Sequence, residues 1–169
     1  EVIAHDLHPD YLATKYALER AAREGLPCVG VQHDHAHIAS CLADNGWRPE
    51  EGPVIGVAWD GTGYGPDGRI WGGEFLIADY TGYRRMGHLE YLPMPGGEAA
   101  IYNPYRLAYG YLYALTGRMP TVPLDKADDV ASKEELHIIQ QQVDQGINCP
   151  WTSAGGRLFD AVAALLGVR

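Results

Sequence analysis

Two stretches decide how this chain can be interpreted: Val31-Gln32-His33-Asp34-His35-Ala36-His37-Ile38-Ala39-Ser40 and, later, Trp59-Asp60-Gly61-Thr62-Gly63-Tyr64-Gly65. His33 and His37 are four residues apart, so a helix would carry both imidazoles on one face, one turn apart. Asp60 follows a separate apolar run and stands beside a glycine-rich turn. Together the two stretches indicate metal and phosphate chemistry.

Neutral imidazole is a common ligand for zinc and iron, and a His pair at this spacing needs a third group. We expect Asp60 to be that group, because side chains at strand ends enter clefts. The pattern lacks the glutamate of the zinc-protease signature, since residue 34 is Asp, and a protease is not indicated. The alternative is that the histidines cap the helix or form hydrogen bonds in the core. The clustering of three histidines favours a metal held by His33, His37 and Asp60.

Hydrophobic patterning predicts an α/β arrangement around these stretches. Val54–Trp59 is nearly continuous in apolar residues, as expected of a central strand buried on both faces. It ends at Asp60 and turns through Gly61–Gly68. The other expected elements are a strand at Val2–Ala4, a helix starting at Pro9 and stopping at Gly25, a buried parallel strand at Cys28–Gln32, a helix from the histidines to Asn45, and strands at Arg69–Ala78 (the return of an antiparallel hairpin) and Tyr83–Leu92.

The pattern changes to helix after the break at Pro93–Gly97. We expect helices at Pro104–Thr116, after the N-cap Ser132, and at Arg157–Leu166, with a linker at Arg118–Asp129 and a loop at Asn148–Gly156. The chain therefore divides into an α/β lobe at 1–92 and a mainly helical part of the same module at 93–169. Both ends look cut, because the first residues form a strand without a start methionine and the last helix ends the chain.

Composition limits the function classes. The 169 residues are 46% hydrophobic and 21% charged, with a formal net charge of −9, which fits a globular protein and argues against a nucleic-acid partner. We expect no membrane span and no signal peptide, since no apolar run approaches about 18 residues. Cys28, Cys41 and Cys149 form no C-x-x-C pair and are expected to be buried free thiols in a reduced compartment, the cytoplasm.

Three glycine-containing segments are candidate nucleotide or anion sites. Gly61, Thr62, Gly63, Tyr64 and Gly65 would bring backbone N–H groups close to an anion, or simply form a hairpin loop. Gly97 and Glu98 precede a helix with Arg106, where a phosphate or ribose could be bound. Thr152–Arg157 has the same character, and ordinary helix capping is the alternative for both.

These motifs taken together resemble the C-terminal catalytic module of the HypF carbamoyltransferases, which mature nickel–iron hydrogenases. The resemblance extends over essentially the whole chain, and the runs that carry it are His5–Tyr11, Val31–His37, Trp59–Gly65 with Gly72–Phe75, Leu92–Ala100 and Thr152–Ala161. The resemblance implies a partial actin/Hsp70-like ATPase fold, with a mixed sheet, flanking helices and a mainly helical part. That module is also similar to the tRNA threonylcarbamoyladenosine transferases and the antibiotic O-carbamoyltransferases.

The resemblance implies carbamoyl transfer from carbamoyl-adenylate, made from carbamoyl phosphate and ATP, to the C-terminal cysteine of the partner HypE. This step leads to the cyanide ligand of the hydrogenase iron. His33, His37 and Asp60 match the metal-binding residues of the family, and Gly61–Gly65 match the loop beside the nucleotide. Glu98 stands where the family usually has Asp.

The family's further metal-binding Asp and both phosphate loops fall outside this chain, so little or no transfer is expected from the segment alone. Two other functions stay open. One is an O-carbamoyltransferase acting on a small-molecule hydroxyl, and the other is a non-catalytic module that binds metal or nucleotide.

Overall fold

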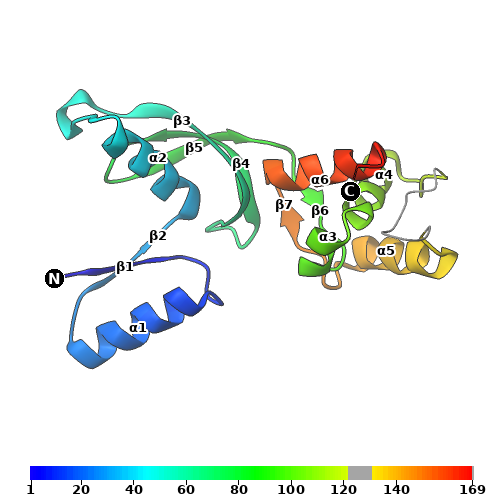
Figure 1. Ribbon diagram of the computed structural model, residues 1–169, viewed down its shortest axis with the longest axis horizontal. Coiled ribbons are helices and arrows are strands. Elements are labelled where there is room, and N and C mark those ends of the chain that lie inside the picture. Colours follow the sequence, from blue (N-terminus) through cyan, green and yellow to red (C-terminus); the bar gives the residue numbers. More distant parts are fainter. Residues whose placement is uncertain (122–130, 169) are drawn as a thin grey trace. The chain divides into compact units, whose positions relative to one another are not determined.

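The parallel pair β1 (Ile3–Asp6) and β2 (Cys28–Val31) opens the fold, with α1 (Leu12–Glu24) as the connection between them. The computed structural model describes residues 1–121 and 131–168. It comprises two compact units, Glu1–His88 and Leu89–Arg169, whose elements are labelled in Figure 1. The parallel pairing confirms the expected strand–helix–strand arrangement. The division of one module into an α/β lobe at 1–92 and a mainly helical part at 93–169 stays a prediction.

The helix α1 begins three residues later than predicted, at Leu12 instead of Pro9. Side chains hold the preceding backbone in a turn: Asp6 accepts from the His8 N–H at 2.7 Å and His8 Nδ1 accepts from the Asp10 N–H at 3.2 Å. Such local bonds compete with helix formation. The predicted stop is confirmed, because Gly25 ends the helix with φ 65°.

Two strands expected to be buried are covered less than the sequence indicated. In β2, Val29 is 50% exposed, since a strand of a two-stranded sheet has few neighbours. In β3 (Val54–Tyr64), burial alternates along the strand and Ile55 is 80% exposed. The prediction of burial on both faces was wrong for β3, because the described elements that pack on it cover one face.

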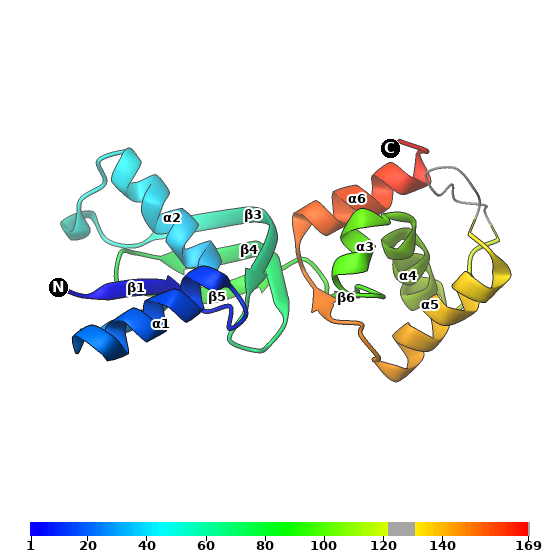
Figure 2. The same ribbon diagram turned by 60° about the horizontal axis from the view of Figure 1, so that its bottom comes forward.

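The first unit also contains an antiparallel sheet of β3, β4 (Ile70–Ala78) and β5 (Tyr83–His88). The helix α2 (His33–Asp44) lies against β3 and β4, as Figures 1 and 2 show. Its buried Ile38 packs where Gly56 leaves room on β3, since a Cβ at Gly56 would lie 2.7 Å from Ile38 Cγ1. The short helix η1 (Pro49–Glu51) lies in the connection from α2 to β3.

Strand boundaries differ from prediction around the hairpin. β3 continues through Tyr64, and the tight turn that follows is closed by the Gly65 N–H, which donates to the Arg69 carbonyl at 2.9 Å. The first half of the predicted loop Gly61–Gly68 is thus strand. The predicted strand at Tyr83–Leu92 is two strands, β5 and the short β6 (Leu92–Pro93).

The second unit packs helices around α4 (Tyr105–Thr116), whose Leu107 and Ala108 are fully buried. Its other elements are α3 (Glu98–Tyr102), α5 (Lys133–Gln145), β7 (Trp151–Thr152), which pairs with β6, and α6 (Gly155–Leu165). Ser132 caps α5 and Gly117 ends α4, as predicted. The predicted loop at Asn148–Gly156 contains β7 and the start of α6. The linker expected at Arg118–Asp129 falls mostly on residues 122–130, outside the described residues.

The cysteines are free, as expected, but only Cys149 is buried; Cys41 is exposed and Cys28 is half-buried. Among the described helices, none has the length and apolar character needed to cross a membrane.

Candidate metal centre

The side chains of His33, His37 and Asp60 lie close together in the first unit, and their role as metal ligands stays a prediction. His33 Nε2 lies 2.9 Å from Asp60 Oδ2, and His37 Nε2 lies 3.5 Å from the same oxygen. The two imidazole Nε2 atoms are 3.2 Å apart. Three candidate ligand atoms therefore surround one point.

This arrangement fits a divalent metal. Ligand atoms bound at about 2.1 Å in a tetrahedral site are roughly 3.4 Å apart, and the three separations of 2.9, 3.2 and 3.5 Å lie around that value. Two imidazoles and one carboxylate suit both zinc and iron. The site is also accessible, because the His37 side chain is 60% exposed.

The start of α2 places the two histidines. Gln32 is the N-cap, and its side chain accepts a hydrogen bond from the His35 N–H at 2.8 Å. The amide of Gln32 also donates to Asp34 Oδ2 at 2.7 Å, and both side chains are buried. Burial raises the pKa of Asp34. Because these contacts fix the first turn, His33 occupies its first position and His37 follows one turn later on the same face.

A bulge in β3 presents Asp60. The strand pairs Trp59 with Gly73 and Gly63 with Trp71, so three residues of β3 lie opposite a single residue of β4. Bulges of this kind redirect side chains and are frequent near functional sites. The prediction that Asp60 stands at a strand end was wrong. Asp60 lies within an irregular part of a longer strand.

Asp6 is a site residue that motif reasoning missed. Its Oδ2 lies 2.7 Å from His33 Nδ1, although the two residues are 27 positions apart in the sequence. The signal was the parallel pairing, because Asp6 is in register with Val31 and parallel strands end at the same edge of a sheet. Only the pairing itself, not the spacing of residues, could identify Asp6.

The charges around His33 affect its pKa. Burial by itself lowers the pKa of His33, but the hydrogen bond to Asp6 and the charges of Asp6 and Asp60 outweigh burial and raise it. Nearby Tyr11 has a raised pKa, mainly through burial and the charge of Asp6, while a hydrogen bond to Thr62 acts in the opposite direction. Tyr11 thus links the segment after β1 to the bulge that carries Asp60.

The third histidine of the cluster has a different role. His35 is buried at 8% exposure, and its Nε2 lies 2.7 Å from the Asp79 carbonyl oxygen in the turn after β4. This contact ties α2 to the sheet. The alternative of a histidine that hydrogen-bonds in the core therefore describes His35, whereas the role of His33 and His37 as metal ligands stays a prediction.

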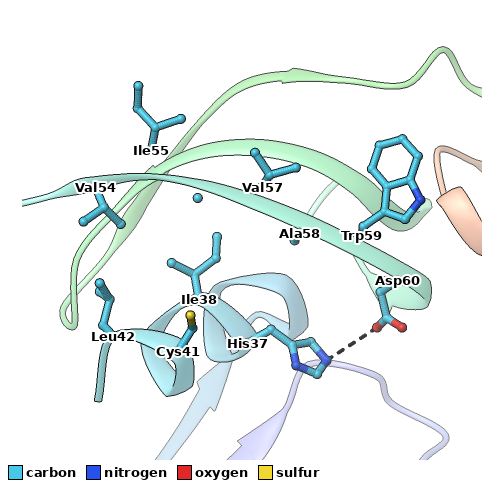
Figure 3. A pocket seen from close by; sticks show the side chains of 11 residues that line it. His37, Ile38, Cys41, Leu42, Val54, Ile55, Val57, Ala58, Trp59 and Asp60 are labelled. Atoms are coloured by element: carbon cyan, nitrogen blue, oxygen red, sulfur yellow. Dashed lines mark ion pairs between the residues drawn. The ribbon is translucent and has the colours of Figure 1, made fainter. Parts of the chain in front are cut away.

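An open groove of about 370 Å³ between α2 and β3 ends at the His37–Asp60 pair, as Figure 3 shows. Its walls are mostly apolar. The lining residues are His37, Ile38, Cys41 and Leu42 of α2 and Val54–Asp60 of β3.

The predicted nucleotide contacts divide between the two units. Gly61, Thr62, Gly63 and Tyr64 lie in β3, and Gly65 begins the turn after it. The remaining predicted contacts, Gly97, Glu98 and Arg106, belong to the second unit.

In the second unit, Gly97 has φ 56° and precedes α3, whose first residue Glu98 is exposed. Arg106 donates to the Pro95 carbonyl at 2.9 Å and to Gln142 Oε1 at 2.6 Å, so it holds the turn before α3 against α5. Binding of nucleotide by these residues stays a prediction. In the Thr152–Arg157 segment, Thr152 Oγ1 accepts from the Ala154 N–H at 3.0 Å.

The comparisons with known proteins agree on the family. The protein family described as "Carbamoyltransferase, Kae1-like Domain, second subdomain" matches residues 56–169. The family described as "HypF Kae1-like domain" matches residues 1–44. The chain belongs to the HypF carbamoyltransferase family. This membership confirms the resemblance inferred from the motifs.

Two curated HypF proteins are each 43% identical to this chain. Carbamoyltransferase HypF2 of Cupriavidus necator matches all of it, and carbamoyltransferase HypF of Rhodobacter capsulatus matches 99%. The matched region is 20% and 22% of those proteins, so the chain spans about a fifth of their length.

Solved HypF structures also match the whole chain. The crystal structure of full-length HypF in the phosphate- and nucleotide-bound form has a TM-score of 0.84 at 45% identity, with 25% of that protein covered. The structure of T. kodakarensis HypF has a TM-score of 0.79 at 34% identity, with 22% covered.

Proposed function

We propose that this chain forms the metal-bearing part of a catalytic domain that transfers a carbamoyl group from carbamoyl-adenylate to the C-terminal cysteine of a HypE-type acceptor protein. The domain would have the actin/Hsp70-like ATPase fold, and carbamoyl phosphate and ATP would supply the adenylate. The observation that carries the proposal is the convergence of His33, His37 and Asp60 in a member of the HypF family.

Zinc or iron held by these three residues would supply a Lewis acid that stabilises negative charge on the adenylate phosphate or the carbamoyl oxygen. The chain contributes orientation: Asp60 is directed by the bulge, and the histidines by the capped start of α2. Gly61–Gly65, Gly97, Glu98 and Arg106 are the proposed nucleotide contacts.

In the transfer, the acceptor cysteine loses its proton and its sulfur forms a bond to the carbamoyl carbon. The bond from that carbon to the phosphate oxygen breaks, and AMP leaves with the electron pair. The nucleophile comes from the acceptor, so the cysteines of this chain have no covalent role. Buried Cys149 fits that view, because its thiol pKa is raised to about 11.

The proposal is tested in the complete protein that contains this chain by following the mass increase of the acceptor's C-terminal peptide. We expect His33→Ala and Asp60→Asn to reduce the rate by more than the 10–100-fold typical of residues that only support a ligand. Asp10→Asn, an exposed carboxylate paired with Lys15, is the control.

Wild-type rates in the His33→Ala protein would refute the metal-site assignment. Transfer to a small-molecule hydroxyl but not to the acceptor protein would instead favour an O-carbamoyltransferase, and binding of metal and ATP without transfer would favour a non-catalytic module. This chain alone is expected to show little or no transfer.

A further inference from the structure

Asp6 is held in place from several directions at the end of β1. Its Oδ1 accepts from the His8 N–H at 2.7 Å, and its carbonyl oxygen accepts from Thr14 Oγ1 at 3.1 Å. Its Oδ2 is then directed at His33 Nδ1, at 2.7 Å. The carboxylate is only 19% exposed, so its orientation is set by the fold and not by solvent.

The two ring nitrogens of His33 face different groups. Nδ1 faces Asp6, whereas Nε2 faces Asp60 and His37 at the candidate metal position. A neutral imidazole carries its proton on one nitrogen only, and the other has the lone pair that binds a metal. An ionised carboxylate can only accept, so it favours the tautomer with the proton on Nδ1.

We propose that Asp6 is a positioning residue that holds His33 in the Nδ1–H tautomer, so that Nε2 presents its lone pair to the metal shared with His37 and Asp60. This inference rests on the metal site of the proposed function. It assigns to the segment after β1 a part in metal binding, although Asp6 lies too far from Asp60 and His37 in the sequence to be recognised as belonging to the site.

His37 provides the contrast within the same site. Its side chain is 60% exposed, and among the described residues no hydrogen bond to its Nδ1 is found. Solvent is therefore free to satisfy either tautomer of His37. The site therefore combines His33, which the fold fixes, with His37, which adapts when metal binds. The affinity of the site for metal then depends on Asp6 more than the three ligands alone would suggest.

Two neutral replacements of Asp6 separate tautomer control from other roles. In Asp6→Asn the amide oxygen is needed by the His8 N–H, so the NH₂ group faces His33 Nδ1 and donates to it. That bond forces the proton onto Nε2, toward the metal position. In Asp6→Ala no group at this position selects a tautomer. Both variants lose the same charge, so any difference between them does not arise from electrostatic attraction of the metal.

The experiment measures zinc affinity of the complete protein by competition with a chromophoric chelator, together with the visible absorption of bound Co²⁺. We expect the affinity order wild type, then Asp6→Ala, then Asp6→Asn, with Asp6→Asn weaker than wild type by about 10–100-fold. Asp10→Asn in the same segment should match wild type. Melting curves recorded without metal show whether each variant is folded.

The reverse order, with isosteric Asp6→Asn binding more tightly than Asp6→Ala, would show that Asp6 acts by packing and would overturn the inference. If Asp6→Ala does not fold, equal affinities of Asp6→Asn and Asp10→Asn overturn it as well. The zinc affinity of an Asp60→Asn protein distinguishes a failure of the role given to Asp6 from a failure of the proposed metal site. Full zinc affinity without the Asp60 carboxylate, or no zinc binding by wild type, refutes the metal site itself and the inference with it.

Discussion

The packing of α2 on β3 sets the separation of the histidines from Asp60, and Gly56→Ala tests it. A methyl group at Gly56 would lie 2.7 Å from Cγ1 and 3.0 Å from Cγ2 of Ile38, and closer still to its Cδ1. Carbon atoms in good contact are about 3.5–4.0 Å apart. Ile38 is only 6% exposed, so α2 must move away from β3 or Ile38 must adopt a strained rotamer. Overpacking of this kind costs about 1–3 kcal/mol.

We therefore expect Gly56→Ala to lower the free energy of unfolding by about 1–3 kcal/mol and to weaken zinc binding, because movement of α2 separates His33 and His37 from Asp60. Urea unfolding and chelator competition measure the two effects. The matched control is Gly87→Ala in β5, where the added methyl would meet nothing closer than 3.9 Å. That variant should be neutral or slightly more stable.

A second substitution makes the test specific. Ile38→Ala alone should destabilise by about 2–5 kcal/mol, as is usual for a buried isoleucine. Combined with Gly56→Ala, the new methyl partly fills the space that Ile38 leaves, so the double variant should be more stable than the sum of the two single effects predicts. Strict additivity, or a Gly56→Ala protein with wild-type stability and zinc affinity, would refute the reasoning.

Three further predictions follow from the structure. Arg85→Met removes the guanidinium that donates to the fully buried Glu74 at 2.7 Å, so unfolding in urea should show a loss of about 3–5 kcal/mol; a loss below 1 kcal/mol contradicts it. Cys149 should react with iodoacetamide far more slowly than exposed Cys41 at pH 8, because burial raises its thiol pKa from 9.0 to about 11. Since the folded-state pKa is the higher one, this group stabilises the fold below pH 9 and the contribution is lost as the pH rises from 9 to about 11; equal alkylation of both thiols in the folded protein contradicts it. Removal of metal by a chelator should lower the melting temperature of wild type but not of Asp60→Asn, since metal at about 100 times its Kd contributes roughly 2.7 kcal/mol; an equal shift in both proteins contradicts it.

The sequence by itself determined those features that depend on neighbours along the chain. The i,i+4 spacing of His33 and His37 placed both on one helical face, Ser132 capped its helix, and Gly25 and Gly117 ended theirs. Helix geometry and capping act over three or four residues, so a pattern of residues is sufficient to predict them.

Tertiary structure decided everything that depends on pairing between distant segments. The parallel register of β1 and β2 brought Asp6 to His33, and the bulge opposite Gly72 directed Asp60. The exposure of Ile55, in a run that looked buried on both faces, depends on which elements cover the strand. An apolar composition indicates that a strand tends to be buried. Which elements cover its two faces is decided only when the sheet forms and packs. The three candidate metal-ligating residues could thus be named from the sequence, whereas the carboxylate of Asp6 beside His33 could be found only in the folded chain.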